Sequence, residues 1–268
     1  MSADSEASPA TTAPLLRLEG LTMTFGGVKA LAGLDLEVPE GQIMAIIGPN
    51  GAGKTTVFNC VTGVFRPTAG RIIFAGRSIA GLRPHRITRT GIARTFQNIR
   101  LFDNMTALEN VQVGADARAR ASVPGALLRT PRHRQEEADG LAEAERLLRF
   151  VGIAQRAGEL ASELSYGDQR RLEIARAMAA RPRLLLLDEP AAGMNPAEKR
   201  ALMALIRQIR RAGLTIVLIE HDMSLVMGIS DRVAVLNFGE KIAEDSPAAV
   251  QRDPTVIAAY LGEPSDAA

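Results

Sequence analysis

The sequence predicts an α/β fold in which a largely parallel sheet follows N-terminal antiparallel strands and is interrupted by a helical segment. Short apolar runs alternate with helical patterns towards both ends of the chain, which is typical of parallel β–α–β units. The first runs alternate apolar and polar residues instead, as half-buried antiparallel strands do. These observations predict a single domain over residues 15–262, with a helical subdomain at about residues 98–181.

The N-terminal third contains the antiparallel strands and the first fully buried strand. Residues 15–25 and 34–38 alternate apolar and polar positions. Residues 43–48, IMAIIG, are apolar throughout, which favours a strand covered on both faces. Glycine and proline then bracket a predicted helix over residues 55–63 and a short strand over residues 71–76.

The helical segment and a second strand–helix series follow. ALENVQVGA and EEADGLAEAERLLRFVG have helical patterns, and a Pro/Arg-rich link at residues 123–134 separates them. Strand–helix alternation resumes with RLLLLDEP, a helix over residues 196–212, the strand LTIVLIEH and a short helix. RVAVLNFGEKIAED then predicts a hairpin that turns at residues 238–239.

Composition places few limits on the partners. The chain has 32 Lys and Arg and 30 Asp and Glu, so its net charge of +2 gives no general reason to expect a nucleic-acid partner. The one cysteine, Cys60, cannot form an internal disulfide, which suits a reducing compartment. Residues 1–14 are interpreted as a disordered tail unlike a secretory signal, and residues 263–268 as a second tail. No apolar run reaches the roughly 18 residues of a membrane span.

The stretch GPNGAGKTT, residues 48–56, matches the phosphate-loop pattern G-x4-G-K-[ST] between a predicted strand and a predicted helix. Such a loop turns backbone N–H groups towards phosphate oxygens at a helix N-terminus. Lys54 adds a positive charge for the β and γ phosphates, and the Thr55 hydroxyl is placed to ligate Mg²⁺. The predicted nucleotide contacts are Asn50, Gly51, Ala52, Gly53, Lys54, Thr55 and Thr56. The sequence therefore predicts a P-loop NTPase core.

Two carboxylates follow the apolar strand at residues 184–187. Ligands bind at the C-terminal ends of parallel strands. We therefore expect Asp188 to hold Mg²⁺ and Glu189 to position an attacking water. Without the phosphate loop, four leucines followed by Asp-Glu-Pro would indicate an ordinary strand end.

Three further residues have both a functional and a structural interpretation. His221 ends the next strand, where it is either structural or a partner of the γ-phosphate. Gln97 follows a strand at the start of the helical segment, and it is either a surface amide or a contact for Mg²⁺ and water. Phe25 belongs to an aromatic set of only 4% of the chain. It either packs in the core or offers its ring to adenine.

These motifs occur in the order and spacing of a known family. GPNGAGKTT, the Gln97 junction, LSYGDQ, LLLLDEP, AGMNP and His221 resemble the ATP-binding cassette of ABC transporters over residues 15–245. The resemblance implies ATP hydrolysis, with Lys54, Gln97, Glu189 and His221 as the reacting groups and Mg²⁺ held by Thr55, Gln97 and Asp188. It also adds Val28, close to Phe25, to the ATP contacts.

The resemblance also gives a function to the turn LSYGDQ. In the family, two cassettes dimerise head to tail, and this signature turn contacts the γ-phosphate bound to the partner. Ser165 and Gly167 are thereby assigned to the partner's ATP, which suits a capped helix N-terminus. Tyr166 and Asp168 depart from the superfamily pattern, where Gly and Gln are usual. We expect Asp168 to point away from the phosphate, towards its own helix N-terminus or the arginines that follow, and closure to be weakened.

A closer resemblance is to the ATP-binding subunits of branched-chain amino acid importers, through FGGVKAL, TTVFNCVTG, GIARTFQNIRLF, DEPAAGMNP and AAYLG. It implies a second cassette, transmembrane permeases, an indirect periplasmic solute-binding protein and a place at the cytoplasmic face of the inner membrane. Asn195 replaces a usual Asp as a subfamily variant. Arg94, Arg100 and residues 102–109 lie where the family binds a permease helix; solvated surface is the alternative for these arginines and is favoured for residues 118–134.

Three alternative functions stay open at this point. Importers of urea and short amides share much of the resemblance, and a lipopolysaccharide-extracting exporter also has a YLG-like C-terminal segment. A soluble cassette ATPase acting on nucleic acid or ribosomes usually has two cassettes or a long coiled coil, and this sequence contains neither. The residues do not distinguish the solute, the direction of transport, or a homodimer from a heterodimer.

Overall fold

The computed structural model describes residues 13–116 and 131–261. The tail predicted at residues 263–268, most of the tail at residues 1–14 and most of the Pro/Arg-rich link lie outside these ranges. So do residues 118–130 of the segment interpreted as solvated surface.

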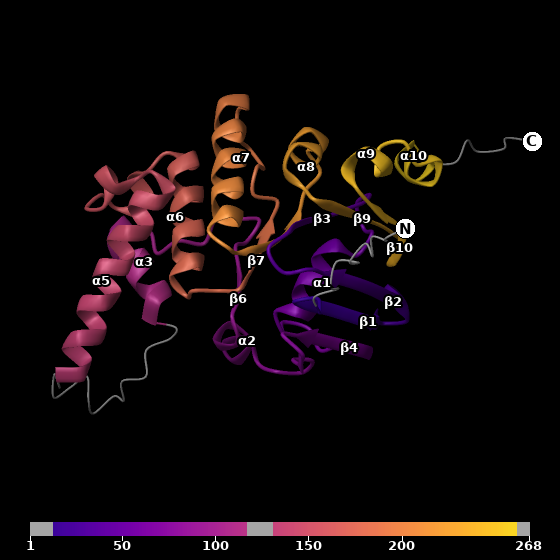
Figure 1. Ribbon diagram of the computed structural model, residues 1–268, viewed down its shortest axis with the longest axis horizontal. Coiled ribbons are helices and arrows are strands. Elements are labelled where there is room, and N and C mark those ends of the chain that lie inside the picture. The colour runs from indigo at the N-terminus through magenta and orange to yellow at the C-terminus, as the bar shows by residue number, and fades with distance from the viewer. Residues whose placement is uncertain (1–12, 117–130, 262–268) are drawn as a thin grey trace, which may run out of the picture.

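A six-stranded sheet forms the centre of the fold (Figure 1), with the strand order β10-β9-β3-β8-β7-β6. Neighbouring strands are parallel except for β9 and β10, which form the predicted hairpin. Every residue of β3, β7 and β8 is buried, as expected for strands covered on both faces. The strands are β3 (Ile43–Ile47), β6 (Ile92–Arg94), β7 (Leu184–Asp188), β8 (Thr215–Ile219), β9 (Arg232–Asn237) and β10 (Glu240–Asp245).

A second, antiparallel sheet has the order β2-β1-β4-β5. It contains β1 (Leu16–Phe25), β2 (Val28–Val38), β4 (Ala69–Phe74) and β5 (Arg77–Ser78). The prediction of β2 was too short, because the strand begins at Val28 and not at Leu34. Phe25 pairs with Val28 across the turn, so the ladder with β1 extends the strand through a stretch without clear alternation.

Helices cover both faces of the central sheet. Figure 1 shows α7 and α8 on one side and α1 with the antiparallel sheet on the other, while α3, α5 and α6 form a group at the β6 end. None of the helices within residues 13–116 and 131–261 is long and apolar enough to cross a bilayer. The helices are α1 (Lys54–Val61), α2 (Pro84–Thr90), α3 (Ala107–Asp116), α5 (Pro131–Val151), α6 (Tyr166–Ala179), α7 (Pro196–Arg211), α8 (Met223–Ile229), α9 (Pro247–Val250) and α10 (Pro254–Leu261).

The central sheet separates two apolar cores. One contains the inner faces of α3, α5, α6, α7 and α8 and one face of the sheet. The other contains α1, the antiparallel sheet and the opposite face. Alternate residues of the buried strands go to each core: Leu185 and Leu187 belong to the first, Leu184 and Leu186 to the second. Burial on both faces therefore holds the strand ends in place.

A glycine sets the close approach of α3 to α6. A Cβ atom on Gly114 would lie 2.2 Å from the backbone oxygen of Arg176, so no larger residue fits without moving a helix. The contact fixes α6 against α3 and, with it, the position of the α6 N-terminus.

Cys60 of α1 supplies a test of this packing. The side chain is buried, and burial raises its pKa to about 11. This rise of about two pKa units lowers the thiolate fraction at pH 8 roughly 90-fold. We expect Ellman's reagent at pH 8 to label the native chain at least that much more slowly than the chain in guanidinium chloride. Equal rates in the two conditions would contradict the buried position of α1.

Candidate active site

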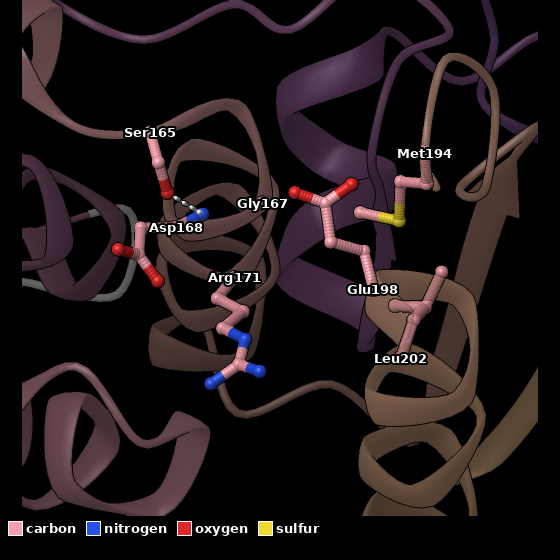
Figure 2. A pocket seen from close by; sticks show the side chains of 7 residues that line it. All are labelled: Ser165, Gly167, Asp168, Arg171, Met194, Glu198 and Leu202. Carbon is pink, nitrogen blue, oxygen red and sulfur yellow. Dashed lines mark hydrogen bonds between the residues drawn. The ribbon is translucent and has the colours of Figure 1, made fainter. Parts of the chain in front are cut away.

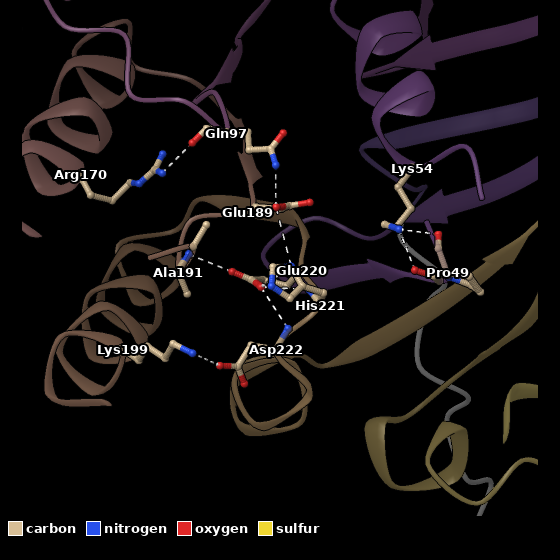
Figure 3. Close-up of polar contacts among 12 residues, drawn as sticks. Pro49, Lys54, Gln97, Arg170, Glu189, Ala191, Lys199, Glu220, His221 and Asp222 are labelled. Carbon is tan, nitrogen blue, oxygen red and sulfur yellow. Dashed lines mark hydrogen bonds and ion pairs between the residues drawn. The ribbon is translucent and has the colours of Figure 1, made fainter. Parts of the chain in front are cut away.

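The phosphate loop lies between β3 and α1, where the sequence places it. Lys54 is the first residue of α1, and its Nζ donates to the backbone oxygens of Gly48 at 2.7 Å and Pro49 at 2.9 Å (Figure 3). Burial lowers the pKa of Lys54, and the charge of Glu189 opposes this effect. The loop therefore holds its cation inside the curve of its own backbone.

Two contacts fix the shape of the loop. A Cβ atom on Gly48 would lie 2.1 Å from the backbone oxygen of Leu236 in β9, so the loop requires glycine there. Ala52 is buried, and its N–H donates to the Pro49 oxygen at 3.2 Å while its own oxygen accepts from Gly239. In this structure Ala52 therefore shapes the loop from inside, whereas Asn50, Gly51 and Thr55 are exposed.

Asp188 ends β7 with its side chain only 5% exposed, against Arg94 of the neighbouring strand β6. The Arg94 Nη2–Asp188 Oδ2 distance is 2.6 Å, and Nη1 donates to Asn59 Oδ1 at 2.7 Å. The guanidinium also lies over the rings of Phe58 and Phe96. Arg94 is thus buried, at 8% exposure, and its expected place on the permease-binding surface was wrong.

Glu189 follows with a backbone φ of 44°, a conformation that costs a residue with a side chain about 1–3 kcal/mol. Its N–H donates to the Ile219 oxygen of β8 at 2.9 Å, which holds this backbone in place. Its Oε2 accepts a hydrogen bond from Gln97 Nε2 at 2.9 Å and lies 3.7 Å from His221 Nδ1. The structure therefore brings together Gln97, Glu189 and His221, three of the predicted reacting groups (Figure 3).

His221 presents 68% of its side chain to solvent. The preceding residue, Glu220, is 1% exposed and was missed by sequence reasoning. Its carboxylate accepts from the N–H groups of Ala191, His221 and Asp222. The only signal was its place at the end of a buried strand next to His221.

Phe25 and Val28 lie opposite each other at the β1–β2 turn, 42% and 70% exposed. The ring of Phe25 contacts Phe65 edge-on at 5.1 Å between centroids. Of the two interpretations of Phe25, the structure supports an available ring, because much of it is exposed. Strand β2 runs from this turn to the phosphate loop, where Ala30 lies against Gly53 and Gly239 bonds both Ala32 and Ala52.

The signature turn begins α6 as a capped helix. Ser165 is the N-cap, and its Oγ accepts from the N–H of Asp168 at 3.2 Å. Ser165, Gly167, Asp168 and Arg171 share a small pocket of about 100 Å³ with residues of α7 and the loop before it (Figure 2). The Asp168 carboxylate thus lies in the first turn of α6, where the helix dipole favours an anion.

Tyr166 and Arg170 join this helix to two other loops. The Tyr166 hydroxyl donates to the oxygen of Ala192 at 2.9 Å. Arg170, fully buried, donates to the oxygens of Phe96 at 2.8 Å and Gln97 at 2.9 Å. Arg170 therefore does not meet Asp168; its ion-pair partner is Glu173, at 2.8 Å. Sequence reasoning missed this network, because the Arg-Arg doublet has the pattern of a solvated face.

Asn195 is the N-cap of α7. Its side chain accepts from the N–H groups of Ala197 and Glu198 at 2.9 and 3.0 Å, and its own N–H donates to the Glu198 carboxylate at 2.9 Å. Asn and Asp cap helices equally well, which accounts physically for the variant at this position.

The donor set suits Mg²⁺. The predicted ligands are the Thr55 hydroxyl, the Asp188 carboxylate and the Gln97 amide oxygen, all of them the hard oxygen donors that this ion prefers. Gln97 uses its Nε2 on Glu189, which leaves its oxygen for a ligand. No group of three His, Cys, Asp or Glu side chains in the described ranges could hold a metal alone.

The fold and the phosphate loop define a P-loop nucleotide-binding protein. A family model described as ABC transporter matches residues 31–192, and one described as branched-chain amino acid ATP-binding cassette transporter matches residues 240–266. The chain is 49% identical over 93% of its length and 98% of the relative to the high-affinity branched-chain amino acid transport ATP-binding protein BraF of Pseudomonas aeruginosa. The LivG protein of the same description from Salmonella typhimurium has the same identity and coverage.

Solved structures agree with this assignment. A nucleotide-free ATP-binding cassette from an ABC transporter superposes with a TM-score of 0.82 at 31% identity, covering 93% of this chain and all of the other. An ADP-bound cassette gives 0.82 at 32% identity, covering 94% and 100%. The chain therefore belongs to the ABC transporter family, as an ATP-hydrolysing cassette, and the predicted fold class is confirmed. Cassettes of this family bind nucleotide and work as membrane-associated dimers with transmembrane permease subunits.

The Arg170–Glu173 pair supplies a stability test. Burial raises the pKa of Glu173, and Arg170 opposes this rise. Arg170→Met leaves a buried carboxylate without its cation, which should cost about 3–5 kcal/mol in the free energy of unfolding. The loss should be largest at high pH and shrink as the pH falls and Glu173 takes up a proton. Urea denaturation at several pH values measures it.

Arg146→Met on the surface of α5 is the matched control. Arg146 is 55% exposed and pairs with Glu143, so its loss should cost at most about 1 kcal/mol. Equal losses for the two variants would show that the Arg170 pair stabilises the fold no more than a surface pair does.

Proposed function

We propose that this chain powers an importer of branched-chain amino acids. The observation that carries the proposal is an identity of 49% to BraF over nearly all of both chains, and the branched-chain family model separately matches residues 240–266. A probable LivG protein from Archaeoglobus fulgidus, described with the same solute class, is 35% identical over 92% of this chain. Relatives from distant organisms are thus described with the same solute class.

We propose the following division of work in the active site. The loop N–H groups and Lys54 bind the β and γ phosphates of ATP, and Phe25 and Val28 contact the adenine. Glu189 positions and deprotonates the attacking water. Gln97 orients Glu189 by the 2.9 Å hydrogen bond, and His221 contacts the γ-phosphate from the exposed side. Thr55, Gln97 and Asp188 would hold Mg²⁺, which would neutralise charge on the phosphates.

The partners of this chain belong to the same proposal. Ser165 and Gly167 contact ATP held by a second cassette, either a copy or a sister chain. The helical subdomain at about residues 98–181 binds a permease through Arg100 and residues 102–109 at the cytoplasmic face. The exposed Phe102 (48%) beside Arg176 supports this surface. A periplasmic solute-binding protein acts indirectly through the permeases.

Glu189→Gln tests the hydrolytic site. The amide keeps an oxygen for Gln97 but cannot take a proton, so kcat should fall by about 10²–10⁴ while ATP still binds. Lys54→Ala should instead weaken ATP binding by roughly 10- to 150-fold, from the loss of about 1.5–3 kcal/mol of charged hydrogen bonding. Phosphate release and nucleotide titration separate the two. Wild-type turnover in the first variant would remove Glu189 from its proposed place.

The solute is tested by uptake. A strain lacking this chain, complemented with wild type or with Glu189→Gln, is supplied with labelled leucine, isoleucine, valine and urea. We expect the wild-type chain alone to restore uptake of the three amino acids, since the variant cannot hydrolyse ATP. Restored uptake of urea without these amino acids would assign the chain to a different importer of the family.

A further inference from the structure

Glu220 is a buried acid between β8 and His221, and the proposed mechanism does not use it. Its side chain is 1% exposed. A buried carboxylate is costly unless hydrogen bonds replace its water. The hydrogen bonds of its carboxylate within the described parts of the chain therefore explain how this acid is tolerated in a buried position.

Those contacts come from two different loops. Oε1 accepts from the N–H of Ala191 at 2.9 Å, two residues after Glu189. Oε2 accepts from the N–H groups of His221 at 3.0 Å and Asp222 at 3.2 Å. Figure 3 shows this one carboxylate lying between the loop that follows β7 and the loop that follows β8.

The far end of the second loop is held separately. Lys199 of α7 donates to Asp222 at 2.6 Å, and Asp222 also caps α8 through the Leu225 N–H. The hydrogen bond from Lys199 lowers the pKa of Asp222. This tie fixes the loop against α7, whereas Glu220 fixes its near end against the backbone after Glu189.

The two side chains beside Glu220 need such support. The imidazole of His221 is mostly exposed, so its position follows its backbone. Glu189 has the strained φ of 44°, which persists only where neighbouring contacts enforce it. The 3.7 Å between Glu189 Oε2 and His221 Nδ1 is too long for a hydrogen bond and does not itself hold the pair together.

We propose that Glu220 is a positioning residue that sets the separation of Glu189 and His221 by bonding the backbone of both loops. This inference rests on the proposed reacting groups. A carboxylate suits the task because both of its oxygens accept, whereas an amide of the same size has one acceptor and one donor group. The donor group of an amide would face an N–H.

Two substitutions distinguish the bond from Glu220 to Ala191, which bridges the two loops, from its local bonds to His221 and Asp222. Glu220→Gln keeps the size but loses one acceptor, so it disturbs at least one loop. Glu220→Asp keeps both acceptors and can still bond the two following N–H groups, as Asp does in turns, but it is too short to reach Ala191. Glu240→Gln, on an exposed position of β10, is the control for removal of one charge.

For both Glu220 variants, assayed as the full chain with its transporter partners, we expect kcat to fall roughly tenfold or more, as for a loss of about 1.4 kcal/mol. The KM for ATP should stay within about threefold, because the phosphate loop is untouched. Glu240→Gln should match wild type. Wild-type kcat in Glu220→Asp would overturn the bridge.

A spectroscopic readout excludes a general structural effect. The chain has three histidines, so ¹⁵N-histidine labelling gives three backbone amide signals, and His221→Ala identifies one. Both Glu220→Gln and Glu220→Asp change the residue next to His221, so each should move the His221 signal and leave the other two in place while kcat falls. Displacement of all three signals in both variants would mean unfolding or repacking and would overturn the proposal.

The same assays distinguish failure of this inference from failure of the proposed site. Normal turnover in Glu189→Gln would remove the reacting group that Glu220 is inferred to position. If kcat falls in Glu189→Gln but is normal in both Glu220 variants, the proposed active site stands and only the positioning by Glu220 is wrong.

Discussion

The parallel pairing of β7 with β8 is the constraint on which the rest of the site depends. Asp188 lies opposite Ile219 in that ladder, so both strands end at the same edge of the sheet. The pairing then continues past the strands, because the Glu189 N–H donates to Ile219. The acids that follow β7 and the Glu220–His221 pair that follows β8 are therefore neighbours by backbone geometry.

This edge gathers three acids, and each is accommodated by different chemistry. Asp188 has the buried guanidinium of Arg94. Glu189, partly exposed at 22%, has the amide of Gln97, and Glu220 has only backbone N–H groups among its described hydrogen bonds. The differences suit the proposed tasks, since Asp188 is held in place by Arg94, whereas Glu189 is partly exposed and can contact a water.

The signature helix is joined to the same edge from the other side. Arg170 contacts the oxygens of Phe96 and Gln97, and Tyr166 contacts the oxygen of Ala192. These hydrogen bonds couple any movement of α6 to both the Gln97 segment and the loop after Glu189. The Tyr at a usual Gly position carries one of these contacts, so its departure from the superfamily pattern has a place in the structure.

The sequence alone determined the local features of this protein. A phosphate loop, strand ends with acids and the Ser165 cap each depend on residues within one turn or loop, and the structure has them where they were expected. Only the tertiary structure decided the state of Arg94, Arg170 and Glu220. All three were charged residues with the pattern of surface or strand-end positions, and each is buried with at least one partner from an element distant in sequence. Burial of a charge depends on all of its partners, and those from distant elements cannot be read from the local sequence.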